Sequence, residues 1–241
     1  MLMKALILAG GFGTRLNDLG KSTAKGLIKI NNKAIIDYIL ESLNNVKSVK
    51  EVIVVTNNKF YNDLRGWKGN KKITLLDNGV DKAENKLGAI GDMYFAIKKL
   101  NIDDDLLILG SDNLFDFQLN GLVSEFYKKR FSYLVVREEK LERMHLYGNA
   151  LINSNLKLID FVEKPEKPLS NLAASCIYLY PREILPLFDF YIKSESNHDQ
   201  PGRFVSWLLK QKKDVYVYKI TGRWFDIGHL ETLNEAIKSF Q

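Results

Sequence analysis

The first half of the sequence alternates short apolar runs with segments of helical period, and this alternation constrains the fold more than any other feature. Strands are predicted at residues 3–9, 52–56, 72–76 and 106–110, and helices near residues 35–45, 58–66 and 87–99. Strands that alternate with crossover helices form a mostly parallel sheet. The sequence therefore predicts an α/β fold with a mixed, mostly parallel central sheet flanked by helices.

The pattern changes at about residue 132. Strands are predicted at residues 132–136, 147–153, 156–162 and 173–180 with little helix between them, which adds an antiparallel or mixed layer to the parallel half. A polar loop at 193–202, a helix at 203–211, a strand at 214–219 and a helix at 230–239 follow. Because no repeat or linker interrupts the pattern, we expect one domain over residues 1–241, with lobes of about 1–131 and 132–241.

The composition excludes several classes of protein. Of the 241 residues, 46% are hydrophobic, enough for an ordinary core, and the single cysteine, Cys176, permits no internal disulfide. No apolar run is long enough for a signal peptide or a membrane span, so we expect a cytoplasmic protein without a membrane partner. The formal charge of +6 suits an anionic ligand. The lysines stand singly or in pairs, without interleaved aromatic residues, so nucleic acid is not the expected partner.

A glycine-rich loop that ends in a cation directly follows the first predicted strand. Residues 10–16 read Gly-Gly-Phe-Gly-Thr-Arg-Leu. Glycines let backbone N–H groups approach phosphate oxygens closely, and the guanidinium of Arg15 binds oxyanions. The dinucleotide-binding fingerprint would need a third glycine at position 16, where the chain has Leu16. A P-loop ending in Gly20-Lys21-Ser22 would need a glycine at position 15, where the chain has Arg15. We therefore predict a loop for a triphosphate, formed by Leu8, Ala9, Gly10, Gly11, Gly13, Thr14 and Arg15.

A carboxylate follows the predicted strand at residues 106–110, where Asp112 stands before Asn113. Ligands of open α/β sheets bind at the carboxyl ends of the strands. An aspartate there suits a hard divalent cation that is bound through one or two carboxylates, water and substrate phosphates. An Asp-Asn turn that caps the next helix would give the same sequence, so Asp112 on its own leaves both readings open.

The loop at residues 10–16 resembles the G-G-x-G-T-R-L loop of the NDP-sugar pyrophosphorylases, which are sugar-1-phosphate nucleotidylyltransferases. Residues 161–165 resemble the F-x-E-K-P segment of that family, and residues 224–228 resemble its W-x-D-I-G segment. The resemblance covers essentially the whole chain and is strongest to short forms similar to glucose-1-phosphate thymidylyltransferase or mannose-1-phosphate guanylyltransferase. It implies a Rossmann-like nucleotidyltransferase fold, with a nucleotide-binding first lobe and a sugar-phosphate-binding second part.

The resemblance also assigns roles to individual residues. It implies that Lys25 acts with Arg15 in neutralising the phosphates during transfer, and that Asp112 and Asp226 hold Mg²⁺, the expected cofactor. Gly88 would flank the nucleobase. The residues implied for the sugar phosphate are Tyr147, Gly148, Glu163, Lys164 and Ser175.

Three positions depart from the family pattern. The proline that normally precedes the lysine is replaced by Ala24, and Ser111 replaces a glycine before Asp112. Cys176 stands where a glycine is frequent, so we expect a narrower or shifted sugar pocket.

The expected function is Mg²⁺-dependent transfer of a nucleotidyl group from a nucleoside triphosphate to a sugar 1-phosphate, which gives an NDP-sugar and pyrophosphate. A hexose 1-phosphate is the expected acceptor, with dTTP or UTP as first choice of nucleotide and GTP or CTP as second. One alternative is a cytidylyltransferase for a non-sugar phosphate such as phosphocholine, and another is a catalytically silent regulator that binds a sugar nucleotide. A silent binder would not need metal carboxylates. The oligomeric state stays open, a homo-oligomer included.

Overall fold

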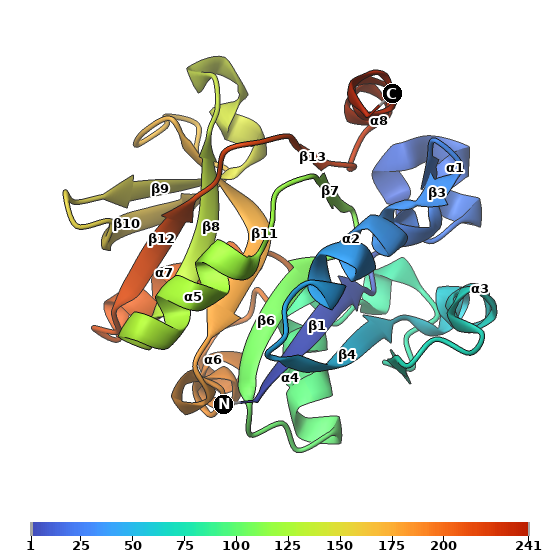
Figure 1. The fold of residues 1–241 in the computed structure, drawn as a ribbon, viewed down its shortest axis with the longest axis horizontal. Coiled ribbons are helices and arrows are strands. Elements are labelled where there is room, and N and C mark those ends of the chain that lie inside the picture. The colour runs from blue at the N-terminus through green and yellow to red at the C-terminus, as the bar shows by residue number, and fades with distance from the viewer. Residues whose placement is uncertain (1, 241) are drawn as a thin grey trace.

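The computed structural model describes residues 2–240, which form a nine-stranded mixed sheet with helices on both faces (Figure 1). The strands of this sheet are β1 (Met3–Ala9), β4 (Val49–Thr56), β5 (Thr74–Asp77), β6 (Asp105–Gly110), β8 (Ser132–Glu138), β9 (Gly148–Ile152), β10 (Leu158–Glu163), β11 (Leu172–Tyr180) and β12 (Val215–Lys219). The main path through the sheet is β10-β9-β11-β6-β1-β4-β5, while β8 pairs with β11 and β12 pairs with β8.

The parallel half of the sheet is built from the predicted strand and helix units. Strand β1 pairs in parallel with β4 on one side and with β6 on the other, and β4 pairs in parallel with β5. The predicted strand at residues 3–9 coincides with β1, and the predicted fold class is confirmed. The carboxyl ends of these strands meet at one edge, which places the loops that follow β1, β4, β5 and β6 near one another.

The strands after residue 131 extend this sheet edge to edge. Strand β11 pairs antiparallel with β6, and it also pairs antiparallel with β8 and β9. Strand β10 pairs antiparallel with β9, whereas β12 pairs in parallel with β8. The predicted antiparallel or mixed addition therefore continues the parallel sheet and does not stack on its face.

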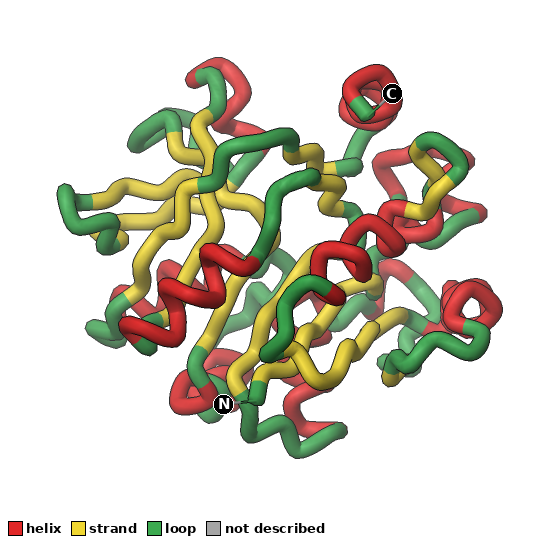
Figure 2. Tube along the Cα trace, viewed as in Figure 1, coloured by secondary structure: helices red, strands yellow, loops and turns green. Residues whose placement is uncertain are grey.

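The helices divide between the two faces of the sheet according to the alternation of apolar residues along the strands. The α-helices are α1 (Asn17–Ser22), α2 (Ile35–Asn44), α3 (Asn58–Lys68), α4 (Gly88–Lys99), α5 (Asn120–Lys129), α6 (Leu187–Ser194), α7 (Gly202–Lys210) and α8 (Leu230–Ser239). Ala5 and Ile7 of β1 pack with α2, α3 and α5, while Leu6 packs on the other face with α4, α6 and α7. Figure 2 shows the helices on either side of the sheet.

The structure contains several elements that the sequence did not predict, among them helices α5 and α6. The segment predicted as an irregular loop up to about Gly20 contains a 3₁₀-helix (Thr14–Leu16) followed by α1. Two very short strands, β7 (Asn113–Phe115) and β13 (Trp224–Asp226), pair antiparallel and were not predicted, because three residues are too few for a periodic pattern. Strands β2 (Lys29–Ile30) and β3 (Lys33–Ala34) form another short pair.

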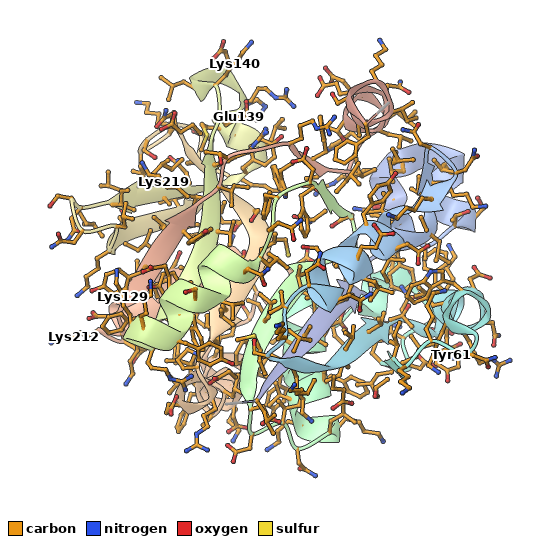
Figure 3. All side chains as sticks on the ribbon, viewed as in Figure 1. Tyr61, Lys129, Glu139, Lys140, Lys212 and Lys219 are labelled. Carbon is orange, nitrogen blue, oxygen red and sulfur yellow. The ribbon has the colours of Figure 1, made fainter. Side chains whose placement is uncertain are left out.

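The last helix packs on the first part of the chain. Leu233 and Ala236 of α8 share a buried cluster with Leu16, Ile30 and other apolar side chains. Figure 1 shows α8 beside α1 and β3. Within the described chain, no helix is both long and apolar enough to cross a membrane. The labelled lysines in Figure 3, Lys129, Lys140, Lys212 and Lys219, lie at the periphery of the molecule on separate segments.

Candidate active site

A cavity of about 360 Å³ lies at the carboxyl ends of β1 and β6 and extends to β10 and β11. Every residue that the sequence predicted for the site lines this cavity except Ala9. Ala9 is buried in β1, where its carbonyl oxygen accepts a hydrogen bond from the Thr56 hydroxyl at 3.3 Å. The described part of the chain thus brings segments from across the sequence to one opening.

The phosphate loop turns sharply after β1 because glycine at position 13 allows a left-handed backbone. Gly13 has φ of +66°, and a Cβ there would lie 2.5 Å from the carbonyl oxygen of Gly20. Its own carbonyl accepts a hydrogen bond from the Leu16 amide at 3.0 Å, which starts the 3₁₀-helix. Thr14 and Arg15 remain exposed at the cavity. The loop therefore presents backbone and a cation to any anion that enters.

The two predicted metal carboxylates meet because β7 and β13 pair. Asp226 is in register with Asn113, the neighbour of Asp112, and the Ile227 amide donates to the Asp112 carbonyl at 2.9 Å. The indole N–H of Trp224 donates to Asn113 Oδ1 at 2.8 Å, which ties the pair further. The ammonium of Lys25 donates to Asp112 Oδ2 at 2.9 Å. Residues that are far apart in the sequence thereby form one charged group.

The electrostatic environment separates the two carboxylates. Burial favours the neutral form of Asp112, but the charge and hydrogen bond of Lys25 hold its pKa below the ordinary value. Burial raises the pKa of Asp226 to about 6, and repulsion from Asp112 adds to the increase against the opposing effect of Lys25. The attraction of Asp112 raises the pKa of Lys25 above its ordinary value, although burial acts in the opposite direction. In the ligand-free site, Lys25 thus neutralises Asp112 and leaves Asp226 in an unfavourable field.

Glu163 and Lys164 lie at the end of β10 and line the same cavity as the glycine-rich loop. Burial raises the pKa of Glu163 above its ordinary value, with opposing effects from Lys164 and Arg203. Lys164 adopts φ of +49°, and its amide donates to the Tyr147 carbonyl at 3.1 Å. A Cβ at Gly202 would lie 2.1 Å from Glu163 Oε2, so the glycine leaves room for this carboxylate.

The remaining residues predicted for the sugar phosphate contribute mainly walls and backbone. Tyr147 is buried with its ring edge-on to Trp224 at 5.5 Å between centroids. The hydroxyl of Ser175 donates to the Val135 carbonyl at 3.0 Å, so within the described residues this hydroxyl serves the sheet. A Cβ at Gly148 would lie 2.4 Å from the Phe161 ring, which explains the glycine by packing.

The sequence reasoning missed residues that line the cavity near the start of α4. These are Ala83, Lys86, Asp92, Asp199, Gln200 and Pro201. The segment at residues 195–201, predicted only as a polar loop, folds over α4, where the amide of Ile90 donates to the His198 carbonyl at 2.8 Å. Lys86 pairs with Asp199 at 2.7 Å. The only local signal was the Pro-Gly pair at residues 201–202. This pair predicts a turn, but it does not indicate that the turn packs against α4.

The carboxylates suit a magnesium ion that is shared with a substrate. Asp112 and Asp226 line the same cavity, and a carboxylate pair with substrate phosphates is a usual set of Mg²⁺ ligands. Among the described residues, no group of three or more His, Cys, Asp or Glu side chains could hold a metal ion. Burial, and then the charge of Asp112, raise the pKa of Asp226, so a bound cation would favour its ionised form. These residues therefore fit a cation that binds with an anionic ligand.

Comparison with known proteins gives consistent relationships. The chain is 30% identical over 230 residues to a protein of Sulfolobus acidocaldarius named provisionally as a mannose-1-phosphate guanyltransferase, covering 94% of this chain and 60% of the relative. It is 25% identical to the UTP–glucose-1-phosphate uridylyltransferase AglF of Haloferax volcanii, covering 99% of this chain and 97% of the relative. The chain spans less than two thirds of the length of the first relatives that it matches, 54% to 65% in each case.

A solved structure shows the same fold. The crystal structure of UDP-glucose pyrophosphorylase complexed with UDP-glucose superimposes with a TM-score of 0.83 at 21% identity, covering 100% of this chain and 98% of the other. The family model described as nucleotidyl transferase matches residues 4–241. The sequence resemblance to this group is thereby confirmed, and the chain belongs to the nucleotidyl transferase family.

Proposed function

We propose that the protein transfers a nucleotidyl group from a nucleoside triphosphate to a sugar 1-phosphate and releases an NDP-sugar and pyrophosphate. One observation carries the proposal: a single cavity is lined by the glycine-rich loop with Arg15, by Glu163 and Lys164, and by the charged group of Lys25, Asp112 and Asp226. Such an arrangement suits two anionic substrates that meet at a charged centre.

The chemistry requires positioning and charge more than proton transfer. A sugar phosphate is already an anionic nucleophile at neutral pH, so no general base has to create one. Arg15 and Lys25 would bind the triphosphate and stabilise the charge that builds up as an oxygen of the sugar phosphate attacks the α-phosphorus. The bond between the α-phosphorus and the bridging oxygen breaks, and pyrophosphate leaves with the electron pair.

Asp112 and Asp226 would hold Mg²⁺, which supplies positive charge to the phosphate oxygens when bound. Lys25 is paired with Asp112 at 2.9 Å. Lys25 thus neutralises one carboxylate, and it lines the cavity where the phosphates would bind.

The sugar phosphate would bind at the end of β10. Lys164 carries a positive charge at this wall, and Glu163 accepts hydrogen bonds from sugar hydroxyls when ionised. Burial raises the pKa of Glu163, and hydroxyl donors would compensate that cost by hydrogen bonding to the charged form. A hexose 1-phosphate, of glucose or mannose, fits this polar wall, and we expect the reaction in the cytoplasm.

The test is a substrate screen with purified protein and Mg²⁺, following pyrophosphate release. The triphosphates GTP, UTP, dTTP, CTP and ATP are each combined with glucose, mannose, galactose and glucosamine 1-phosphates and with phosphocholine. Turnover with a sugar 1-phosphate supports the proposal. A preference for phosphocholine would show that the acceptor is not a sugar 1-phosphate. Nucleotide binding without turnover for every pair would point to the silent regulator.

A further inference from the structure

A buried carboxylate at one end of the cavity has no role in the reaction proposed above. Asp92 belongs to α4, lines the cavity and is only 5% exposed. Its Oδ1 accepts a hydrogen bond from Asn78 Nδ2 at 2.6 Å, and Oδ2 has no hydrogen-bond partner among the residues that the structure describes. Oδ2 is accessible within the cavity, so it can accept a hydrogen bond from a ligand.

The position of Asp92 places it at the nucleobase end. Along the sheet, the sugar-phosphate wall lies at β10 and β11 and the charged centre follows β6, while Asp92 contacts the segments that follow β1 and β5. A triphosphate whose α-phosphorus is at the charged centre must extend its base to one side of that centre. Because the sugar phosphate occupies the β10 side, the base falls on the side of Asp92.

The same end is unsuited to phosphates. The first amides of α4 are already used, since Ala89 donates to the Asp199 carbonyl at 3.3 Å and Ile90 donates to the His198 carbonyl at 2.8 Å. A helix start that is capped in this way offers these N–H groups to no anion. Asp92 adds a carboxylate, and Lys86 is paired with Asp199. A neutral base with N–H groups is therefore the part of a nucleotide that fits here.

The neighbours of Asp92 hold its carboxylate in one orientation. Asn78 is itself fixed, because its Oδ1 accepts the Val80 amide at 2.9 Å while its Nδ2 donates to Asp92. A Cβ at Gly10 would lie 2.1 Å from Asp92 Oδ2, so glycine is required for the loop to pass over this oxygen. Gly10 thus has a task beyond the phosphates. The carboxylate is held rigidly enough to discriminate between ligands.

We propose that Asp92 reads the nucleobase and selects guanine. The inference rests on the proposed nucleotidyl transfer, and it places GTP before the dTTP or UTP that the sequence analysis expected first. An ionised carboxylate accepts hydrogen bonds only. Guanine presents two adjacent donors, N1–H and the 2-amino group. Uracil and thymine flank N3–H with two carbonyl oxygens, and cytosine and adenine place a ring nitrogen acceptor beside their amino groups, so each would set an acceptor against the second carboxylate oxygen.

The ionisation state agrees with this role. Burial raises the pKa of Asp92 to about 6, the hydrogen bond from Asn78 opposes that increase, and the charge of Asp199 adds to it. At neutral pH the group is therefore largely an acceptor-only carboxylate. Contacts from a base to a buried carboxylate of this kind discriminate by roughly one to two orders of magnitude in affinity.

The experiment measures equilibrium binding of GTP, ITP, XTP and UTP to the full chain by calorimetry with Mg²⁺ and without sugar phosphate. ITP lacks the 2-amino group, and XTP carries an oxygen in its place. For the unaltered protein we expect GTP to bind about tenfold more tightly than ITP and more tightly still than XTP or UTP. This series needs no variant, so it tests the proposal independently of folding.

The variant Asp92→Asn replaces one acceptor oxygen by an amide donor at nearly the same shape. We expect it to lose about tenfold or more in GTP affinity and to gain affinity for XTP, while Asp214→Asn, at the surface pair with Lys157, leaves the ratios unchanged. Two results would overturn the role of Asp92 and leave nucleotidyl transfer standing. One is equal affinity of the unaltered protein for GTP and UTP. The other is a folded Asp92→Asn protein whose ratio of GTP affinity to XTP affinity is unchanged. Absence of nucleotide binding would instead overturn the proposed function.

Discussion

At the scale of single residues, one cation, Lys25, and two carboxylates, Asp112 and Asp226, form a charged group in the cavity. Lys25 bonds to Asp112 and not to Asp226, and this asymmetry gives the two acids opposite pKa shifts. Two buried carboxylates that share one cation repel each other when both are ionised. Replacing one acid is therefore expected to separate stability from activity.

We predict that Asp226→Asn abolishes turnover but stabilises the metal-free protein. The pKa of Asp226 is raised to about 6, so the folded state disfavours the ionised form at pH 7, and a neutral amide removes that cost. For wild type, the same linkage makes this group's contribution more favourable as pH falls through about 6. A gain of about 1 kcal/mol would raise the melting temperature by about 2–4 °C.

Pyrophosphate release and thermal unfolding in a metal chelator check this prediction, with Asp112→Asn as the companion variant. Both variants should lack activity, because each removes a metal carboxylate. Wild-type activity in either would contradict the assignment of that residue.

Arg15 and Lys164 line the cavity from different segments, the loop after β1 and the end of β10, so their loss should affect different substrates. We expect Arg15→Gln to weaken use of the nucleotide and Lys164→Gln to weaken use of the sugar phosphate, each by about 1.5–3 kcal/mol in kcat/KM. Lys164 has φ of +49°, a backbone conformation that is strained for lysine and glutamine alike. Glutamine is chosen because the substitution then removes the charge without changing the backbone strain. Steady-state kinetics with each substrate varied give the answer, Lys167→Gln being the exposed control. Equal losses toward both substrates would show that the walls are assigned wrongly.

At the scale of elements, the loop at residues 195–201 caps α4 and lines the end of the cavity where we propose that the base binds. The cap requires glycine at position 88, because Gly88 has φ of +78° and a Cβ there would lie 2.5 Å from the His198 carbonyl oxygen. The loop brings Asp199, Gln200 and Pro201 to the cavity. The geometry of one residue in α4 thus determines whether a distant segment reaches the site.

We predict that Gly88→Ala costs about 1–3 kcal/mol in unfolding free energy and raises KM for the nucleotide more than for the sugar phosphate. The matched control is Gly66→Ala in α3, where no atom lies within 4 Å of the added Cβ. That change should be neutral or stabilising by up to about 1 kcal/mol. Urea unfolding and kinetics test both variants, and a Gly88→Ala protein as stable and active as Gly66→Ala would rule out the capping role.

At the scale of the whole molecule, a buried ion pair links the parallel half of the sheet to its antiparallel extension. Asp105 at the start of β6 is 3% exposed and accepts two hydrogen bonds from Arg130, which follows α5. The same carboxylate accepts the Arg182 amide, beyond β11, at 3.2 Å. One acid therefore holds three segments together at the edge opposite the cavity.

We expect Arg130→Gln to lower the free energy of unfolding by about 3 kcal/mol, because it leaves a buried carboxylate without its cation. Catalysis by the folded fraction should remain normal, since neither Asp105 nor Arg130 lines the cavity. The control Lys128→Gln removes an exposed pair with Glu125 and should cost less than about 1 kcal/mol. Denaturant unfolding measures both, and equal effects would show that the buried pair has no special weight.

Local chemistry made much of this protein predictable. Apolar periodicity gave the nine strands of the main sheet within a few residues, because side-chain alternation along a strand depends on the strand's own sequence. The glycine-rich loop was recognisable because glycine at position 13 is required by its own backbone. Helix α1 was missed, since its six residues include Gly20 and are too few for a clear period.

The sequence by itself determined the fold class, the nine strands of the main sheet and the motifs whose residues line the cavity. Only the tertiary structure decided that β7 pairs with β13 and brings Asp226 to Asp112, and that Asp92 and the loop at residues 195–201 share one end of the cavity. The physical reason is the sequence distance over which each kind of interaction acts. Backbone conformation and apolar alternation act between neighbours along the chain, whereas the meeting of distant charged side chains depends on how the completed sheet and its helices pack.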